Sequence, residues 1–452
     1  MTRFRSFHFS RRQGFYLLAA LLVLQLFTVV YFYLFFHRNG YLPSPFLYNK
    51  ANTFMDLFNT MFWASHTGRY EIWKSVYPPL VFIFLNSVKA ILIPTMIYPN
   101  PNELRAGAYN VEIALVIVYF ALPALALSLQ IWRGFNIREK LLIYVTAVSS
   151  IPFLFALERG NVILLATPLL TLLFGKSQRW RVLALALLIN IKPYFALLFL
   201  AYAVKKYWDE LFIVVLATGT TYLATATMLN VNFTSMLFNL VGFTQHSIFS
   251  LRDILSFPNS VSAFSTVLSN PRFIHSKYSI HWMNPLWIAE FINICKWAII
   301  GWSFTEIFRA SKEISIGVSF TLLIIIITNF GNSTGGYSLI FYFALIPALK
   351  DMRYAPLYFL IVAAIYLPLD PLFPLVHNNL GTQISFLGGR AVDVQWTFGL
   401  MTALRPWLNL LFLAVMAFEL SRLRVPIQTR QIALDGHHIL PFLNTNGNHD
   451  VN

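Results

Sequence analysis

The chain has 452 residues, of which 57% are hydrophobic and only 11% are charged, and its mean hydropathy is +0.62. Soluble domains carry about 25% charged residues, so this composition excludes an ordinary soluble protein and indicates a polytopic membrane protein. The net charge of +15 lies largely in short loops, as expected where lysine and arginine mark the cytoplasmic side of a membrane. We therefore expect membrane lipids and no nucleic acid as partners, and the single cysteine, Cys295, excludes an internal disulfide.

The N-terminal region resembles a signal peptide, because four arginines precede an apolar stretch from Phe15 to Phe36. That stretch has about 20 residues, the length of a transmembrane helix. It also lacks a small-residue cleavage site. We therefore predict a retained first helix whose N-terminus is in the cytoplasm.

Further apolar segments follow along the chain, and several are shorter than the roughly 20 residues that span a bilayer alone. Together with the first, the segments long enough for helices are 14–36, 79–97, 109–131, 141–157, 162–174, 182–191, 193–204, 211–230, 286–309, 314–329, 338–349, 354–368 and 402–420. They predict an all-α polytopic protein of about 12 transmembrane helices. We expect a single domain, residues 1–430, followed by a disordered cytoplasmic tail, residues 431–452.

Loop charge predicts on which side of the membrane each loop lies. The basic loops, which we place in the cytoplasm, are 133–140, 176–181, 205–206, 309–312, 350–353 and 422–430. The loops that then face outward are 37–78, 158–161, the turn at 192, 231–285, 330–337 and 369–401. Two cytoplasmic termini require an even number of crossings, whereas the apolar segments given above number thirteen. Either one segment within 79–131 therefore does not span the membrane, or loop 133–140 breaks the charge rule.

A polar island, Ala-Leu-Glu-Arg-Gly-Asn at 156–161, lies between two of these apolar segments. Charges near hydrocarbon are costly, so such a cluster is a candidate functional site. Either Glu158 and Arg159 form a structural ion pair, or Arg159 binds a lipid-linked phosphate while Glu158 and Asn161 contact substrate.

The segment 182–204 contains a second island, Lys192-Pro193-Tyr194. It is either one helix kinked by the proline, which buries Lys192 at mid-membrane, or two short helices that meet at an outer turn. We favour two helices, because they leave both flanking basic loops on one side. Lys192 is then a second candidate for phosphate binding and Tyr194 a candidate substrate contact, the structural alternative being a lysine that snorkels to water.

Asp56 lies in a segment whose apolar residues recur at near-helical spacing, which predicts an amphipathic helix on the outer surface. Its carboxylate is a candidate general base for a hydroxyl, or else a solvated or helix-capping acid. Tyr77 is a candidate substrate contact. It comes directly before two prolines, which begin the next apolar segment because proline suits the first turn of a helix.

The outer loop 231–285 carries Arg252, Asn259 and Ser260, which are candidates for phosphate and substrate binding if the loop re-enters the membrane surface, and solvated residues otherwise. Three histidines in this loop lack metal-ligand spacing, so we expect no metal site.

The stretch 329–337 reads Asn-Phe-Gly-Asn-Ser-Thr-Gly-Gly-Tyr. Its glycines permit close backbone approach to a ligand beside Tyr337, or form a tight turn. The sequence contains neither a Gly-x-x-x-x-Gly-Lys-Ser/Thr phosphate loop nor a Rossmann fingerprint. We therefore expect neither ATP hydrolysis by that route nor a soluble domain for a nucleotide sugar.

The motifs occur in a particular order: an acid in the first outer loop, Tyr-Pro-Pro-Leu, a Gly-Asn turn and a Lys-Pro-Tyr turn. Over roughly residues 14–350 this order resembles glycosyltransferase family 87, which consists of polytopic enzymes of the GT-C superfamily and includes the polyprenyl-phosphomannose-dependent mannosyltransferases of mycobacteria. The chain departs from the family at two points. Many relatives carry Gly-Gln where this chain has Gly160-Asn161, and relatives often carry a histidine-bearing motif where this chain has 333–337.

The resemblance implies a GT-C-type bundle and a metal-independent hexosyltransferase without a cofactor, in a bacterial inner membrane with its active site facing the periplasm. The donor would be a polyprenyl-phosphate sugar, and the acceptor a hydroxyl of a lipid-linked glycan or glycolipid. Asp56 has the position of the family's catalytic base, and direct displacement would invert the anomeric carbon. Two alternatives stay open: a flippase of lipid-linked oligosaccharides, although transporters tend to carry repeats and midplane charges, and a polysaccharide polymerase that would use the 231–285 loop.

Overall fold

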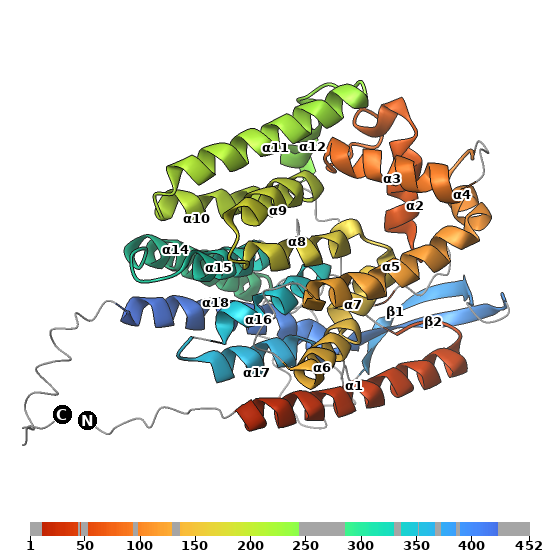
Figure 1. Cartoon of the computed structure of the whole chain (residues 1–452). Helices are drawn as coiled ribbons and strands as arrows, with labels where there is room; N and C mark the ends of the chain where they lie inside the picture. Colours follow the sequence, from red (N-terminus) through yellow and green to blue (C-terminus); the bar gives the residue numbers. More distant parts are fainter. Residues whose placement is uncertain are drawn as a thin grey trace, which may run out of the picture.

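Figure 1 shows the computed structural model of the protein, in which helices lie side by side in a bundle with one β-hairpin at its edge. The residues that the structure describes are 11–43, 46, 53–93, 98–128, 136–243, 285–329, 336–350, 352–366, 372–385 and 389–423. The predicted site residues Arg252, Asn259 and Ser260 lie outside these ranges, as does the predicted disordered tail.

The fold is mainly helical, in agreement with the apolar segments. The α-helices are α1 (Arg11–Asn39), α2 (Met55–Ala64), α3 (Pro79–Leu92), α4 (Pro101–Gly107), α5 (Tyr109–Ser128), α6 (Ile137–Val148), α7 (Ile151–Arg159), α8 (Ala166–Leu173), α9 (Gln178–Ile191), α10 (Phe199–Val204), α11 (Trp208–Met228), α12 (Ser235–Phe243), α14 (Pro285–Arg309), α15 (Ile316–Asn329), α16 (Tyr342–Leu349), α17 (Ala355–Tyr366) and α18 (Leu400–Arg422). Short 3-10 helices are η2 (Thr67–Arg69), η4 (Val162–Leu165), η5 (Pro193–Leu198) and η6 (Gly336–Phe341). Each predicted apolar segment falls on one or two of these helices, and the predicted amphipathic helix is α2. Helices α4 and α12 lie where no helix was predicted.

Three described helices are long and apolar enough to cross a membrane: α5 over Tyr109–Ala126, α11 over Trp208–Met228 and α18 over Leu404–Arg422. Helices α6 and α7, which meet at a bend of 55°, form a fourth if the pair is one span. These numbers refer to the described residues alone. They indicate a membrane protein, and a total of about 12 spans stays a prediction.

A β-hairpin lies in the segment 369–401, where the sequence predicted only an outer loop, so the all-α expectation is wrong for this segment. Strand β1 (Leu372–Ile384) pairs antiparallel with β2 (Ala391–Gly399). Strand β2 alternates apolar and polar residues, which is the pattern of a half-buried strand. Accordingly Val394 is buried beside Tyr41 and its neighbour Asp393 is exposed. A search for long apolar segments passes over such a strand because every second residue is polar.

The bend between α6 and α7 follows from the residues at their junction. The Ser150 side chain caps α7 by accepting a hydrogen bond from the Phe153 N–H at 3.4 Å. Pro152 in the first turn has no N–H to donate to the preceding helix. The chain therefore turns and starts a new helix, which carries the polar island at its C-terminal end.

Helix α9 ends at Ile191 because a proline follows the next residue. Lys192 is extended, with φ −140° and ψ 109°, as expected for a residue that precedes proline. Helix η5 then begins at Pro193. The prediction of two short helices in place of one kinked helix is confirmed, while the side of the membrane on which the turn lies stays a prediction.

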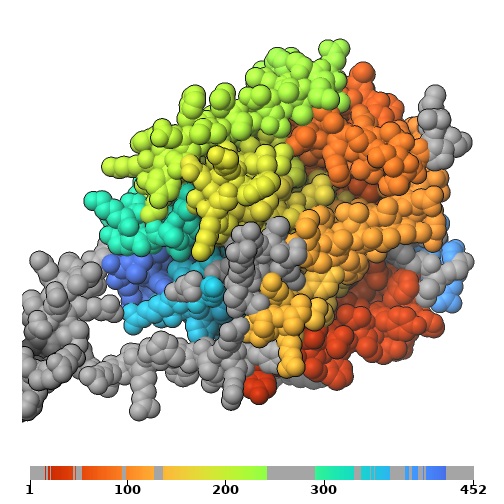
Figure 2. Space-filling view, in the orientation of Figure 1, coloured from red at the N-terminus to blue at the C-terminus, as the bar shows by residue number. Residues whose placement is uncertain are grey.

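Two large clusters of buried side chains among the described residues stabilise the bundle. The larger is centred on α15, whose residues 319–329 are all buried, as expected for a helix that is apolar all round. The smaller joins α2, α3 and α4, which form the orange lobe next to α9 and α11 in Figures 1 and 2. Val162 and Ile191, the sequence neighbours of Asn161 and Lys192, belong to this smaller cluster. The polar islands therefore lie where the lobe meets the main bundle.

Candidate functional site

Polar side chains from several separate segments meet where α2 packs against the end of α7. All come from helix ends or loops that the charge pattern placed on one side of the membrane. They are Asp56, Tyr77, Arg159, Asn161, Lys192 and Tyr337.

Asp56 lies in the first turn of α2 and is held by two donors from the turn after α7. The Arg159 guanidinium forms an ion pair with the carboxylate oxygen Oδ1, and the Asn161 amide donates to Oδ2 at 2.9 Å. The side chains of Asp56 and Arg159 are only 16% and 22% exposed, which strengthens charge-assisted hydrogen bonds. The sequence suggested Glu158 as the ion-pair partner of Arg159, whereas the structure gives this role to Asp56, 103 residues away.

Gly160 allows the start of α2 to approach the end of α7. Its φ of +66° lies in the left-handed region, which glycine adopts at the C-terminal cap of a helix. A Cβ at this position would lie 3.0 Å from the Leu57 Cβ and 3.3 Å from the Phe54 Cα. The Phe54 N–H donates to the Glu158 carbonyl at 2.7 Å. Glu158 is itself buried, and its backbone carbonyl makes this contact between the two helices.

The orientation of the Asn161 amide is fixed by its surroundings. Its side-chain oxygen accepts a hydrogen bond from the Ile163 N–H at 3.1 Å and so caps η4, which leaves the NH₂ group for Asp56. Its backbone carbonyl accepts a hydrogen bond from the Tyr119 hydroxyl of α5. Sequence analysis missed Tyr119, whose only signal is a hydroxyl within a long apolar segment.

The turn between α9 and η5 places the Lys192 ammonium over two aromatic rings, 4.3 Å from the ring centroid of Tyr77 and 6.0 Å from that of Tyr337. Among the described residues it has no hydrogen-bond partner and no carboxylate within 4 Å. Desolvation lowers the pKa of Lys192 to about 8, and the negative charge of Asp56 opposes this shift. The ammonium is therefore largely charged at neutral pH and available to an anionic ligand.

Tyr77 is held by the loop that precedes α3. Its carbonyl accepts a hydrogen bond from the buried Tyr70 hydroxyl at 2.9 Å, and Pro79 starts the helix as predicted. Burial raises the pKa of the Tyr77 hydroxyl far above its ordinary value, the charge of Asp56 raises it further, and Arg159 opposes the increase. The phenol is therefore a neutral hydrogen-bond donor close to Asp56.

Tyr337 and Tyr194 line the same region. Tyr337 is buried and stacks on Phe155 of α7 with ring centroids 6.1 Å apart. Tyr194 packs against Phe341 of η6, and its buried hydroxyl has no hydrogen-bond partner among the described residues. That hydroxyl is a polar group that a ligand can satisfy.

No family model, curated protein or solved structure matches this chain. The function has to be inferred from the chemistry of the site: a carboxylate fixed by two donors, a second cation, and tyrosine hydroxyls nearby. In the described ranges no three His, Cys, Asp or Glu side chains come together as metal ligands. The residues suited to holding a phosphate are Arg159 and Lys192.

Two contacts join segments at or next to the basic loops that were predicted to be cytoplasmic. The Lys205 ammonium donates to the carbonyls of Ser311 and Ile314, so the loops at 205–206 and 309–312 are adjacent. Similarly, the Arg353 N–H donates to Glu419 of α18 at 2.7 Å, close to the basic end of that helix. Such grouping is what a common side of the membrane requires.

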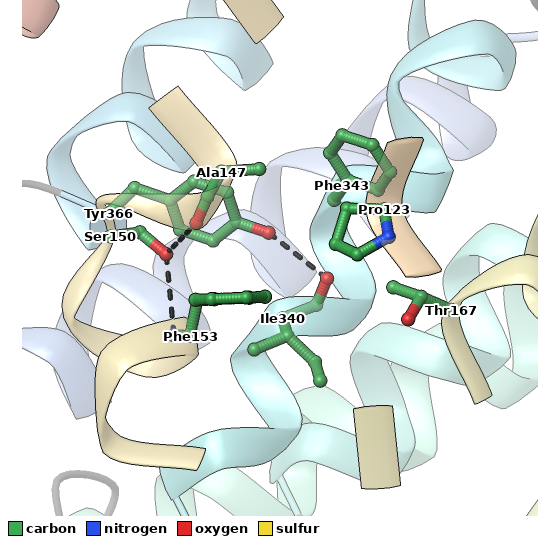
Figure 3. Close-up of a pocket in the computed structure, with 8 residues that line it drawn as sticks. All are labelled: Pro123, Ala147, Ser150, Phe153, Thr167, Ile340, Phe343 and Tyr366. Atoms are coloured by element: carbon green, nitrogen blue, oxygen red, sulfur yellow. Dashed lines mark hydrogen bonds between the residues drawn. The ribbon is translucent and has the colours of Figure 1, made fainter. Parts of the chain in front are cut away.

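A separate small hollow lies between α5, α6, α7, α8, η6, α16 and α17. Figure 3 shows the side chains that line it, which are Pro123, Ala147, Ser150, Phe153, Thr167, Ile340, Phe343 and Tyr366. The Tyr366 hydroxyl donates to the Ile340 carbonyl at 3.2 Å, and the Ser150 hydroxyl to the Ala147 carbonyl at 2.6 Å. Because these polar groups are satisfied within the protein, the hollow is unsuited to a sugar, and the polar site beside Asp56 is the better candidate.

Proposed function

We propose that this protein is a membrane glycosyltransferase that transfers a sugar from a polyprenyl-phosphate donor to a hydroxyl of a lipid-linked glycan or glycolipid. The observation that carries the proposal is the pairing of a fixed carboxylate with two cations at the junction of apolar helices. Asp56 supplies the carboxylate, and Arg159 and Lys192 supply the cations. Such a combination suits a reaction in which a proton is removed on one side and a phosphate leaves on the other.

In the proposed reaction Asp56 accepts the proton of the acceptor hydroxyl. The acceptor oxygen forms a bond to the anomeric carbon as the bond from that carbon to the phosphate oxygen breaks, and the electron pair stays on the leaving polyprenyl phosphate. Direct displacement inverts the anomeric centre. Fixing Asp56 through Arg159 and Asn161 supports this role, because a general base acts only within hydrogen-bonding distance of the proton.

The two cations have different tasks in this proposal. Arg159 is committed to Asp56 through one terminal nitrogen, while its Nε has no partner among the described residues. Lys192 has no carboxylate partner in the described part of the chain and is the main counter-charge for the phosphate. The hydroxyls of Tyr77 and Tyr194 are suited to contacts with the donor sugar or phosphate, and Tyr337 bounds the site through its ring.

The apolar helices supply the surface for a polyprenyl chain, and the basic loops support an orientation in which the site faces outward. We place the protein in the inner membrane with cytoplasmic termini and an active site on the periplasmic side. Arg252, Asn259 and Ser260 remain candidates for donor and acceptor binding within this proposal.

The test is sugar transfer by the purified protein in detergent, from a panel of polyprenyl-phosphate sugars to extracted membrane lipids. Asp56→Asn should abolish transfer in a protein that still elutes as a folded species and unfolds cooperatively, although loss of the ion pair with Arg159 should lower its melting temperature. The matched control is Asp209→Asn, which makes the same change at an exposed acid in the first turn of α11 and should keep full activity. Equal activity in both variants would refute the role of Asp56. Movement of labelled lipid across vesicles without sugar transfer would favour a flippase.

A further inference from the structure

Helix α2 presents one partly exposed stripe alongside a buried face. Asp56, Asn59 and Trp63 are partly exposed, whereas residues such as Phe58 and Met61 are fully buried. Spacings of three and seven residues keep the stripe on one side of a helix, and they place Asn59 about 4.5 Å and Trp63 about 10.5 Å from Asp56 along the axis. The candidate base therefore lies at one end of a polar and aromatic track.

The far end of this track is a pair of nearly parallel indole rings. Trp63 and Trp73 have ring centroids 6.3 Å apart and an interplanar angle of 17°. Phe62 and His66 pack nearly perpendicular to Trp73, with ring centroids 5.7 Å and 5.5 Å away. Rings supported in this way lose little entropy when a ligand binds.

The loop that carries Trp73 is fixed by a buried arginine. Arg69 is 5% exposed, and its guanidinium donates to the carbonyl of Ala64 at 3.1 Å and to that of Leu229 at 3.4 Å. Asn239 of α12 donates to the Ser75 carbonyl at 3.1 Å. The arrangement of the two indoles is therefore built into the fold.

Asn59 lies between the base and the indoles, and its amide has no hydrogen-bond partner among the described residues. An amide offers two donors and an acceptor, which suits the vicinal hydroxyls of a sugar. A flat indole suits the apolar C–H face of a sugar ring. Along this track the carboxylate of Asp56 is followed by the amide of Asn59 and then by the aromatic pair. This order matches a chain of sugar units that extends away from a reacting hydroxyl.

We propose that Asn59, Trp63 and Trp73 form a saccharide subsite, which holds a sugar unit of the acceptor beyond the one whose hydroxyl reacts at Asp56. The description of this sugar as the acceptor rests on the proposed function, whereas binding of a saccharide to these three residues does not. Tryptophan is also common at membrane interfaces. Alignment on one helix face with a carboxylate and with an amide that has no partner among the described residues distinguishes this pair from a lipid anchor, which needs neither.

The experiment is ligand-observed saturation-transfer NMR on the full-length protein in detergent, with soluble gluco-, galacto- and manno-oligosaccharides from mono- to tetrasaccharides as probes. We expect binding by the wild type, about tenfold weaker binding by Trp63→Leu and by Asn59→Ala, and partial recovery in Trp63→Phe. Trp180→Leu is the matched control, because Trp180 is 55% exposed in the first turn of α9, and it should bind as the wild type does.

Asp56→Asn separates this inference from the proposed function. If the Asp56→Asn variant binds saccharide but transfers no sugar, whereas the wild type does both, the result supports the subsite and the proposed function. If the wild type binds saccharide but transfers no sugar, the result supports the subsite alone. The subsite is overturned if no probe binds, or if Trp63→Leu and Trp63→Phe bind as well as Trp180→Leu. It is equally overturned if the Trp63 variants change only partitioning into lipid vesicles.

Discussion

Replacement of Gly160 by alanine is expected to separate α2 from the end of α7. An L-residue in the left-handed region costs about 1–2 kcal/mol. The added methyl would also lie 3.0 Å from the Leu57 Cβ and 3.3 Å from the Phe54 backbone, and such overpacking costs about 1–3 kcal/mol. We therefore expect a loss of about 2–5 kcal/mol in stability. Asp56 should at the same time move away from Arg159, so sugar transfer should fall more steeply than stability.

The assay is thermal unfolding of the purified protein in detergent, with Gly219→Ala as the matched control. Gly219 lies within α11, and a Cβ there meets nothing within 4 Å. The same added methyl should stabilise that helix by up to about 1 kcal/mol. If Gly160→Ala unfolds at the temperature of Gly219→Ala or of the wild type, the close packing of α2 on the α7 turn is refuted, and with it the structural basis of the site.

Three further changes test the site and the fold. Deprotonation of Lys192 removes the charge that binds phosphate, so the KM for the donor should rise as pH increases through about 8. The rise should be about tenfold per pH unit, and Lys192→Arg should move it to higher pH. Tyr119→Phe removes the hydroxyl that binds the Asn161 carbonyl and should cost about 1 kcal/mol in thermal unfolding. Glu419→Ala leaves the buried donors around that carboxylate unpaired and should cost about 2–4 kcal/mol, whereas Glu313→Ala, at an exposed acid, should change little.

Each of these has an opposing outcome. A donor KM with the same pH profile in wild type and Lys192→Arg would show that another group binds the phosphate. Wild-type stability of Tyr119→Phe would show that the Asn161 turn is held without that hydroxyl. Equal melting temperatures of Glu419→Ala and Glu313→Ala would show that the Glu419 carboxylate does not stabilise the contact between α17 and α18.

The helices were predictable because long apolar segments and helix-terminating prolines are local signals. Pro193 forces Lys192 out of the helical region, so the break after α9 could be inferred without any contact. The hairpin, α4 and α12 were missed, because a short helix or an alternating strand depends on neighbours for stability and leaves no long apolar signal. Val394 shows this, since it packs against Tyr41 and Phe35 of the N-terminal segment.

Most residues of the candidate site could be named from the sequence, but the contacts between them could not. Charged residues between apolar segments are costly, so the positions of Asp56, Arg159 and Lys192 in the sequence marked them as candidates. That Arg159 pairs with Asp56 depends on how α2 packs against α7, which no short-range pattern encodes. Tyr119 was missed for the same reason, because a single hydroxyl within an apolar helix becomes informative only once its partner is known.

The ion pair between Asp56 and Arg159 also constrains the order of events during synthesis, because its members are 103 residues apart in the chain. Translation at about 5–20 residues per second separates their emergence from the ribosome by about 5 to 20 s. During that interval α2 is already made while the turn against which it packs does not yet exist. A nascent chain therefore carries its acidic residue without the basic partner, so the candidate site can form only after much of the bundle has entered the membrane.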